Sequence, residues 1–440
     1  MTKINFYNGL REIGGTFVEI ETEKAKCMFD FGFAVVDRMD SNIKLRKENC
    51  ASDYVRLGML TPADGIYDKK TAEKLGLKAY GETKQECFFV ISHMHIDHMG
   101  GLGMLAPEIP VYMSEDSLRL YHAMDKDNDL GEMGAHPNCK GIAYHESFTI
   151  GDIKVTVLPI DHDVIGASGF LIETPDGNIC YTGDYRFHGF HPEITQAFAE
   201  QVKGADVMIT EGVTVSFSDI DMCSLEKPTL EEKAAEWTEE ALQTQMAELA
   251  KSAQKLLIIN PYIRNVERLH RLLHTFDEQG RTLVLEKQAA DYVAAFYPED
   301  KLYVYANTLE EQKTACSLID RDEILAHPEK YVLQLDYSHS YELIDLCQSI
   351  SMYVHMDGSP LGDYDPSFKK MHVMLEVLGI EYIYKGTGGH ARPYYLRYMV
   401  DTIAPKTLIP LHSFRPEQVK SDKAGEQFLP EYGDTFVLEK

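Results

Sequence analysis

The chain has 440 residues, of which 44% are hydrophobic, a composition typical of a soluble enzyme with about two domains. No apolar run approaches the roughly eighteen residues that cross a membrane, and Met1–Phe6 lacks the basic and apolar parts of an export signal. The 70 acidic and 43 basic residues give a formal net charge of −27, which argues against a broad basic surface for long nucleic acids. We therefore expect a cytoplasmic protein that binds no membrane, with its eight scattered cysteines reduced.

Four potential metal ligands lie within the six positions from His93 to His98. The apolar run Phe88–Ile91 predicts a buried strand that ends just before this segment. Alternate residues of an extended segment point the same way, so His93 and His95 are expected on one side. Asp97 and His98 come where the glycine-rich residues 99–103 turn toward a helix, so they can face a second ion. The segment predicts a site for one or two metal ions.

This pattern resembles the metal-binding signature of the metallo-β-lactamase superfamily, which implies further ligands in a set order. His162 follows the strand-like residues 154–158, Asp184 ends a Thr-Gly-Asp sequence after another strand, and His412 ends the strand-like residues 408–412. Ligands at strand ends suit a site built on a rigid scaffold. The resemblance implies one ion held by His93, His95 and His162, a bridging carboxylate at Asp184, and a second ion held by Asp97, His98 and His412.

Neutral imidazoles and carboxylates around an open position are typical of catalytic zinc. Manganese and iron use the same ligand types. We therefore expect two Zn²⁺ per chain, with Mn²⁺ or iron as alternatives.

A domain-sized insertion separates Asp184 from His412, which lie 228 positions apart. Within it, predicted strands 256–260, 281–285, 331–335 and 351–355 accompany predicted helices 264–276 and 286–296, and this rhythm predicts a small parallel sheet covered by helices. The insertion is similar to that of the β-CASP branch of the superfamily, whose members cut nucleic acid. We expect an α/β fold, an αββα sandwich of residues 1–215 and 376–440 with an inserted α/β parallel-sheet cap over residues 216–375.

Two further motifs carry the β-CASP resemblance. Thr210-Glu-Gly212 matches its acidic motif through Glu211, and Gly388-Gly-His-Ala391 matches its histidine motif through His390. A histidine at the third motif, here His412, is associated with members that cut RNA. The resemblance implies that His390 binds phosphate and acts as general acid, that Glu211 orients it or raises its pKa, and that the catalytic residues are Asp97, Glu211 and His390.

The opening residues Gly9–Gly15 are similar to the start of ribonuclease J-type proteins. Ribonuclease J carries an additional C-terminal domain after the last motif, whereas 28 residues follow His412 in this sequence. The substrate class is therefore not carried over unchanged.

The candidate substrate-binding residues fall in two places. The glycine-rich residues 386–389 can bring backbone amides and His390 to a phosphate, and a tight turn joining cap and hydrolase domain is the alternative. A strand-to-helix junction at Ser338 and His339 can contact phosphate at a helix N-terminus, and a simple N-cap cluster explains it equally well. The predicted substrate contacts are Lys385, Gly388, Gly389, His390, Ser338 and His339.

Two other features receive structural interpretations. His270 and His274 stand four apart on a predicted helix without the catalytic glutamate of a zincin pattern, and we interpret them as surface or packing residues. Residues 34–86 exceed the simplest family pattern, and we interpret them as a loop excursion rather than an active-site flap.

The leading hypothesis is a dinuclear zinc phosphodiesterase of the β-CASP type that cuts RNA, with a metal-bridging hydroxide as nucleophile. Because the chain is so acidic, a short or single-stranded RNA is the favoured partner. The alternatives are a DNA-directed nuclease, a metallohydrolase acting on a small molecule such as a cyclic nucleotide or another ester, and a non-catalytic binding module. The oligomeric state stays open, with a homodimer as one option.

Overall fold

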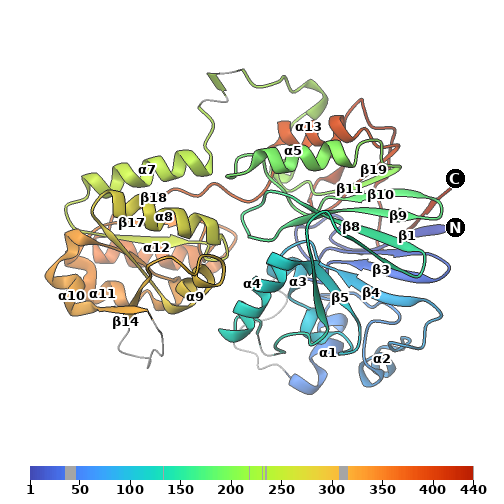
Figure 1. Ribbon diagram of the computed structural model, residues 1–440, viewed down its shortest axis with the longest axis horizontal. Helices are drawn as coiled ribbons and strands as arrows, with labels where there is room; N and C mark the ends of the chain where they lie inside the picture. Colours follow the sequence, from blue (N-terminus) through green and yellow to red (C-terminus); the bar gives the residue numbers. More distant parts are fainter. Residues whose placement is uncertain are drawn as a thin grey trace. The chain divides into compact units, whose positions relative to one another are not determined.

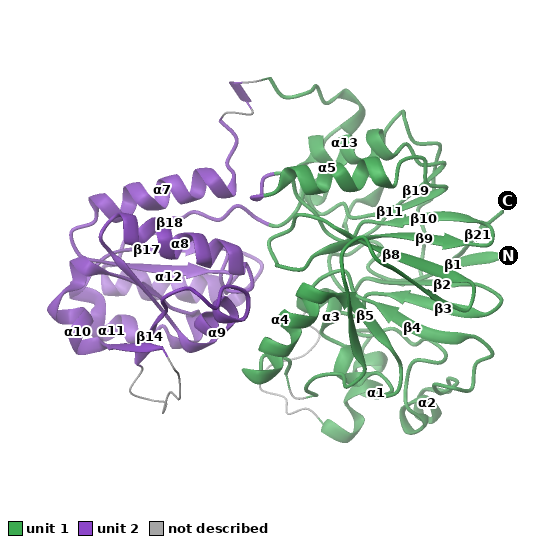
Figure 2. Cartoon of the chain, viewed as in Figure 1, with its two compact units in different colours: residues 1–187, 191–229, 389–440 green, residues 188–190, 230–388 purple. Residues whose placement is uncertain are grey.

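The computed structural model describes residues 1–34, 46–131, 133–217, 219–229, 231–232, 235–306 and 316–439. The chain forms two compact units, unit 1 with residues 1–187, 191–229 and 389–440 and unit 2 with residues 188–190 and 230–388 (Figures 1 and 2). The sequence placed the insertion at 216–375, and the main segment of unit 2 is residues 230–388. Among the described helices, none is long and apolar enough to cross a membrane.

Unit 1 contains two sheets, each of seven strands over its described residues. In spatial order, the first sheet consists of β21 (Thr435–Leu438), β1 (Thr2–Asn8), β2 (Phe17–Glu21), β3 (Ala25–Phe29), β4 (Glu86–Val90), β5 (Val111–Ser114) and β6 (Cys139–Ile142). The second consists of β20 (Glu426–Gln427), β19 (Thr407–Pro410), β11 (Val207–Thr210), β10 (Gly177–Tyr181), β9 (Ser168–Thr174), β8 (Ile153–Pro159) and β7 (Ser147–Ile150).

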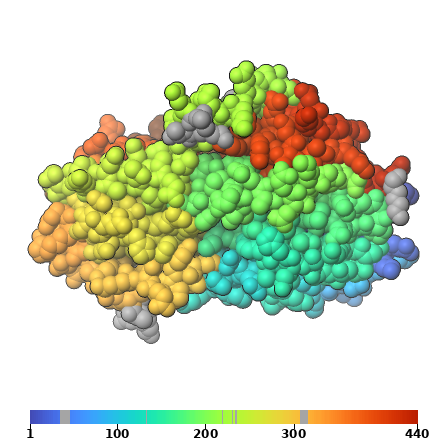
Figure 3. Space-filling view, turned by 45° about the horizontal axis from the view of Figure 1, so that its top comes forward, coloured from blue at the N-terminus to red at the C-terminus, as the bar shows by residue number. Residues whose placement is uncertain are grey.

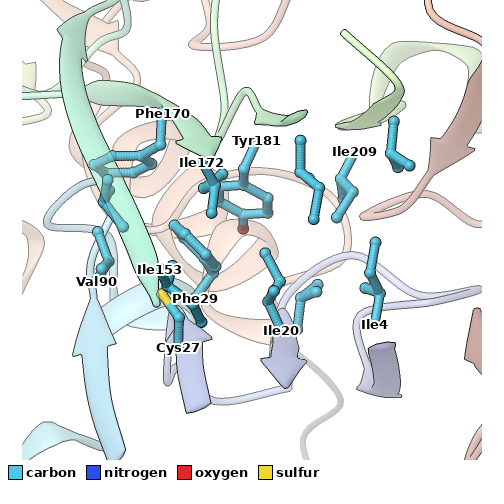
Figure 4. Packing of buried hydrophobic residues seen from close by; sticks show 14 of the residues in the cluster. Ile4, Ile20, Cys27, Phe29, Val90, Ile153, Phe170, Ile172, Tyr181 and Ile209 are labelled. Atoms are coloured by element: carbon cyan, nitrogen blue, oxygen red, sulfur yellow. The ribbon is translucent and has the colours of Figure 1, made fainter. Parts of the chain in front are cut away.

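One hydrophobic core lies between the two sheets (Figure 4). Ile4 and Phe29 enter it from the first sheet, and Phe170 and Ile209 enter it from the second, all fully buried. Strand side chains alternate between faces, so every second residue of these strands can reach this core. Burying each such side chain contributes about 1.5–3 kcal/mol, which keeps the two sheets packed face to face.

Helices cover the outer faces of this sandwich. α5 (Pro192–Gln201) and α13 (Pro393–Ile403) lie side by side on the second sheet (Figures 1 and 3), where Phe198 and Met399 share a buried cluster with Met208 of β11. α4 (Glu115–Lys126) packs against β5 and β6 of the first sheet. The predicted αββα sandwich is confirmed.

Residues 34–86, interpreted from the sequence as a loop excursion, contain two helices, α1 (Cys50–Arg56) and α2 (Lys69–Leu75). α2 begins at Asp68, whose side chain accepts a hydrogen bond from the Thr71 amide, and it ends at Gly76 in a left-handed conformation. The excursion therefore contains capped secondary structure. Residues 35–45 of this segment lie outside the described residues.

Unit 2 contains one sheet in which each pair of described neighbouring strands is parallel. In spatial order its strands are β15 (Ser317–Asp320), β14 (Tyr303–Ala306), β13 (Thr282–Leu285), β16 (Tyr331–Gln334), β12 (Leu256–Pro261), β17 (Ile350–Met356) and β18 (Tyr382–Tyr384). The helices are α7 (Glu239–Ser252), α8 (Val266–Glu278), α9 (Lys287–Phe296), α10 (Arg321–Ala326), α11 (Glu342–Leu346) and α12 (Pro366–Leu378). The predicted parallel sheet and the two predicted helices, α8 and α9, are confirmed.

Candidate metal centre

The predicted metal ligands come from loops at strand ends. His162 follows β8, Asp184 follows β10 and His412 follows β19. β10, β11 and β19 are parallel, and β8 runs the same way because β9 is antiparallel to both β8 and β10. The carboxyl ends of these four strands therefore meet at one edge of the second sheet. The segment from His93 to His98 follows β4 of the first sheet, and α3 (Ile96–Met99) begins within it.

Three imidazoles form the first ligand group. His93 Nε2 lies 3.1 Å from His95 Nδ1, which in turn lies 3.3 Å from His162 Nε2. Tetrahedral zinc with Zn–N bonds of about 2.0–2.1 Å keeps neighbouring nitrogens roughly 3.3–3.4 Å apart, so this spacing suits one ion. His162 Nδ1 donates a 2.6 Å hydrogen bond to the Gly389 carbonyl, which leaves the lone pair on Nε2.

The second ligand group contains Asp97, His98 and His412. The Nε2 atoms of His98 and His412 lie 3.7 and 3.6 Å from Asp97 Oδ2. His412 Nδ1 lies 2.9 Å from the Thr16 hydroxyl and 3.2 Å from the Gly14 amide. The Gly14 amide donates to Nδ1 in this structure. A ligand role for His412 Nε2 requires the other tautomer, in which Nδ1 gives up this contact and donates its hydrogen to Thr16.

Asp184 lies between the two groups. Its Oδ2 atom is 3.8 Å from His93 Nε2, 3.2 Å from His98 Nε2 and 3.4 Å from His412 Nε2. Asp184 Oδ2, His98 Nε2 and His412 Nε2 are buried, and among the described residues none of them has a hydrogen-bond partner of acceptable geometry. An unsatisfied buried polar atom costs about 1–3 kcal/mol, and bound cations remove that penalty. The donor set therefore fits metal ions, with Asp184 placed to bridge them.

Two of the candidate ligand histidines are neutral, as metal binding requires, and a third is protonated in the metal-free protein. Burial lowers the pKa of His93 well below its usual value and that of His162 to about 3, so both imidazoles are neutral. Burial also lowers the pKa of His98, but the carboxylates of Asp184 and Asp97 outweigh burial and raise this pKa well above its usual value. A proton on His98 thus offsets negative charge that a metal cation would otherwise neutralise.

His390 and Glu211 form a pair beside these ligands. Glu211 follows β11, and its Oε2 atom lies 3.0 Å from His390 Nδ1, while its Oε1 atom accepts a 3.4 Å hydrogen bond from the Ala391 amide. His390 Nδ1 is also 3.8 Å from Asp184 Oδ2. Burial lowers the pKa of His390, but the charges of Glu211 and Asp184 outweigh it and raise this pKa to about 10. The geometry brings together the metal ligands and the two other residues that the sequence predicted as catalytic.

Comparisons with known proteins agree with this site. A family model described as "Beta-lactamase superfamily domain" matches residues 87–253. Ribonuclease J of Pyrococcus abyssi is 23% identical over 290 residues, which cover 64% of this chain and 58% of that protein. Ribonuclease J of Mycoplasma genitalium is 21% identical over 444 residues, which cover 93% of this chain and 68% of that protein. The chain belongs to the β-CASP branch of the metallo-β-lactamase superfamily.

Two further comparisons bear on this β-CASP protein. Endoribonuclease YSH1 of Gibberella zeae is 31% identical over 143 residues, which cover 28% of this chain and 17% of that protein. A crystal structure titled as a protein of unknown function from Enterococcus faecalis V583 has a TM-score of 0.82 and 27% identity, and the match covers 99% of this chain and 100% of that one. The chain thus spans only 58% of the Pyrococcus abyssi relative but matches the Enterococcus faecalis structure over its full length.

Asp30 contacts the candidate ligand His98, and the sequence did not predict it. Its Oδ2 atom lies 2.8 Å from His98 Nδ1 and accepts hydrogen bonds from the hydroxyls of Tyr181 and Ser92, at 2.6 and 2.9 Å. Because a carboxylate accepts, His98 Nδ1 donates and its Nε2 keeps the lone pair. Asp30 and His412 both adopt positive φ, at 60° and 51°, and such conformations cluster at functional sites. The available signal was a single carboxylate in the otherwise apolar residues 27–33.

Asp163 is a second residue that contacts a candidate ligand and that the sequence did not predict. Its Oδ1 atom lies 3.2 Å from His95 Nε2. His95 therefore faces the other imidazoles with Nδ1 and faces Asp163 with Nε2. A carboxylate on the far nitrogen of a ligand histidine fixes its tautomer and raises its basicity.

Gly389, predicted as a substrate contact, lies against the ligands. Its carbonyl accepts the hydrogen bond from His162 described above, and a Cβ atom at this position would lie 2.6 Å from Asp163 Oδ1 and 2.7 Å from His162 Cε1. Only glycine allows the backbone to approach the ligands this closely.

The predicted substrate contacts Lys385 and Gly388 belong to unit 2 and make their hydrogen bonds there. Lys385 Nζ donates to Gln245 Oε1 at 2.7 Å, and the Gly388 amide donates to Asp357 Oδ2 at 3.3 Å. The side chain of Lys385 is thus already engaged. A role toward substrate stays a proposal for both residues.

Ser338 and His339 also belong to unit 2. The amide and hydroxyl of Ser338 donate to Asp336 Oδ1 at 2.8 and 2.6 Å, and Asp336 caps the short helical turn that contains both residues. His339 Nδ1 lies 2.5 Å from Glu286 Oε1. These contacts are those of the N-cap cluster that the sequence analysis kept as an alternative to phosphate binding.

Proposed function

We propose that this β-CASP protein is a metal-dependent phosphodiesterase that cuts RNA, with short or single-stranded RNA as its partner. The supporting observation is the position of Asp184 Oδ2, 3.2 Å from His98 Nε2 and 3.8 Å from both His93 Nε2 and His390 Nδ1. This single atom links both ligand groups to the proposed acid. We further propose two Zn²⁺ ions per chain, with Mn²⁺ or iron as alternatives, and a cytoplasmic location.

Each catalytic group has a separate task in this proposal. Bound to the ligands described above, the ions would supply a hydroxide nucleophile at neutral pH and neutralise charge on the phosphate oxygens. His390 holds one proton at Nδ1, where Glu211 Oε2 accepts it at 3.0 Å. The raised pKa keeps the second proton on Nε2 at neutral pH, available to a phosphate oxygen and then to the leaving oxygen. Asp97 contributes to catalysis as a ligand.

Cleavage of labelled RNA, with DNA and small diesters in parallel, tests the proposal. Metal-loaded protein should cut single-stranded RNA, and His390→Ala should slow cutting by about 10²–10⁴-fold while its metal content stays that of the wild type. His122→Ala, which removes an exposed histidine of α4, should leave the rate unchanged. The proposal is wrong if no RNA cleavage depends on both His390 and the metals.

One observation favours a second candidate, a metallohydrolase acting on a small phosphodiester or ester such as a cyclic nucleotide. The formal charge of −27 opposes the approach of a long polyanion, whereas a small substrate meets only the local charge of the site. Turnover of small diesters with inert RNA would support this candidate. Cleavage of DNA alone would indicate a DNA-directed nuclease, and less than one metal per purified chain would indicate a non-catalytic module.

A further inference from the structure

Unit 2 contains a second cluster of metal-binding side chains, separate from the β-CASP centre. His270 and His274 lie on α8, and Asp300 lies in the turn between α9 and β14. One ligand atom of each side chain lies within 4.8 Å of a ligand atom of the other two. We propose that these three residues bind one divalent transition-metal ion, with zinc as the first choice, and that this ion ties α8 to the turn after α9.

The distances within the cluster suit a shared ion. Asp300 Oδ2 lies 2.7 Å from His270 Nδ1, and Asp300 Oδ1 lies 3.5 Å from His274 Nε2. Zinc bonds of about 2.0–2.2 Å to nitrogen and oxygen place neighbouring ligand atoms roughly 3.3–3.5 Å apart. Asp300 Oδ1 and His274 Nε2 already have this spacing. Asp300 Oδ2 and His270 Nδ1 reach it if they move apart by roughly 1 Å or less. A rotation of the Asp300 carboxylate provides that change.

The backbone and a neighbouring ring hold two of the three ligands in place before any ion binds. The ring of Tyr297 stacks on His270 with centroids 3.7 Å apart and planes 6° apart. The Asp300 amide donates to the Tyr297 carbonyl at 3.1 Å, so the same residue fixes the turn that carries the carboxylate. The side chain of Asp300 is 10% exposed, whereas that of His274 is 62% exposed. An ion can therefore enter from solvent onto a carboxylate that is already positioned.

The identity of the donors selects the class of ion. Two imidazoles and one carboxylate favour zinc and other first-row transition metals over magnesium or calcium, which prefer oxygen ligands alone. Histidines at positions i and i+4 of a helix share one face, which is the spacing of the zinc-binding pair in the His-Glu-x-x-His pattern. Within the described part of unit 2, His270, His274 and Asp300 form the cluster that combines two histidines with a carboxylate.

The residue after His270 shows that this ion would not activate water as in a zincin. Arg271 occupies the position where the zincin pattern has its glutamate, and its guanidinium is paired with Glu267 at 2.8 Å and with Glu240 at 2.9 Å. The position of the zincin general base is therefore occupied by a cation that is already paired. The ion would serve to fix α8 against the α9–β14 turn.

Binding also sets a requirement on His270. In the ion-free state its Nδ1 donates to Asp300, and an ion at Nδ1 requires the neutral tautomer with hydrogen on Nε2. This change of tautomer moves the ring hydrogen from Nδ1 to Nε2, so it involves no net release of a proton.

Zinc titration of the full-length chain tests the proposal. Protein stripped with a chelator is reloaded with Zn²⁺, and bound zinc is measured for the wild type, His274→Ala and Asp300→Asn. Each variant should bind about one zinc fewer per chain than the wild type, at the same RNA-cleavage rate. His122→Ala, an exposed helix histidine outside the cluster, should retain the wild-type zinc content.

Amide hydrogen exchange gives a readout that does not depend on counting ions at the β-CASP centre. Adding Zn²⁺ should slow exchange in peptides covering 266–278 and 297–301 of the wild type, and His274→Ala should lose this protection. Equal zinc content in wild type and both variants would overturn the proposal, and so would equal protection. In either case the three side chains form only a hydrogen-bonded cluster.

Discussion

The Gly389 carbonyl accepts a 2.6 Å hydrogen bond from His162 Nδ1, so the residue before His390 holds a ligand of the proposed metal centre. The backbone of the histidine motif therefore serves two purposes. It presents His390 to Glu211, and it fixes the tautomer of His162. A change at Gly389 is expected to act on metal binding rather than on substrate contact.

Gly389→Ala should weaken metal binding by about 10–100-fold, as changes around metal ligands commonly do. The new Cβ atom would lie 2.6 Å from Asp163 Oδ1 and 2.7 Å from His162 Cε1, so the ligand ring or the backbone must move. Competition with a chromogenic chelator measures the affinity. Gly362→Ala is the matched control, because its Cβ atom would meet Tyr364 at an ordinary 3.5 Å. Unchanged affinity in Gly389→Ala would show that the carbonyl contact with His162 is dispensable.

Asp30→Asn should lower both metal affinity, by about 10–100-fold, and stability, by about 1–3 kcal/mol. Asp30 accepts from the amide and hydroxyl of Ser92, from Tyr181 and from His98, and an asparagine must turn its NH₂ group toward at least one of these donors. Metal titration and urea unfolding measure the two effects. Asp68→Asn, a surface N-cap of α2 where asparagine caps equally well, should change neither. A stable Asp30→Asn protein with normal metal affinity contradicts the assigned role.

Glu211→Gln should move the alkaline limb of the kcat–pH profile to lower pH. Burial lowers the pKa of His390 and the charge of Glu211 raises it. Without that charge, the pKa of His390 should fall from its value of about 10 in the metal-free protein. A general acid with a lower pKa loses its proton at lower pH, so activity is lost earlier as pH rises. Glu417→Gln, at an exposed pair with Arg11, provides the control. An alkaline limb that stays in place would show that Glu211 only positions His390.

The metal ligands could be predicted because their donors are dense in sequence and follow recognisable strands. His93, His95 and His98 lie on one short segment. The strand before His162 alternates apolar and polar residues, and the strand before His412 is an apolar run. Asp30 could not be found in this way. It reaches His98 through the pairing of β3 with β4, a long-range contact that no local pattern specifies.

The main segment of unit 2, residues 230–388, differs from the expected insertion at 216–375 for a similar reason. Met222 lies past the expected boundary at 215, yet it is fully buried in the core of unit 1 beneath α13, and Arg397 of that helix donates to the carbonyls of Met222, Cys223 and Leu225. At the other end, β18 is an edge strand of the sheet of unit 2 and lies beyond the expected boundary at 375. These contacts engage the guanidinium of Arg397 within unit 1.

Removing metal should lower the stability of unit 1. Three buried atoms around Asp184 lose their proposed cation partner, and ligand at about 100-fold above its Kd stabilises a protein by roughly 2.7 kcal/mol. Thermal unfolding of chelator-treated and zinc-reloaded protein measures the shift. The measurement uses the His274→Ala variant, so that an ion bound in unit 2 does not contribute to the shift of the midpoint. If zinc fails to restore the midpoint in this background, the ligand set around Asp184 does not bind it tightly.

Glu239 and Arg268 form a buried ion pair that connects α7 to α8, and the final prediction concerns its strength. Arg268 Nη2 lies 2.8 Å from Glu239 Oε1, and the two side chains are 1% and 0% exposed. The same guanidinium donates to Thr387 Oγ1 at 2.7 Å, so it also holds the backbone segment that leads to His390. Loss of Glu239 would leave the buried guanidinium with one carboxylate, Asp357 Oδ2 at 3.2 Å from Nη1, in place of two.

Glu239→Gln should therefore destabilise unit 2 by about 1–3 kcal/mol, because Asp357 still pairs with the guanidinium. The neighbouring Glu240→Gln breaks a pair with Arg271 whose side chains are 65% and 34% exposed, and it should cost less than about 1 kcal/mol. Trp237 is the single tryptophan of the chain and lies in unit 2, so its fluorescence during urea unfolding reports on this unit directly. Similar midpoints for both variants would mean that solvent or a rearranged neighbour compensates Arg268, and the ion pair would then contribute no more than a surface contact.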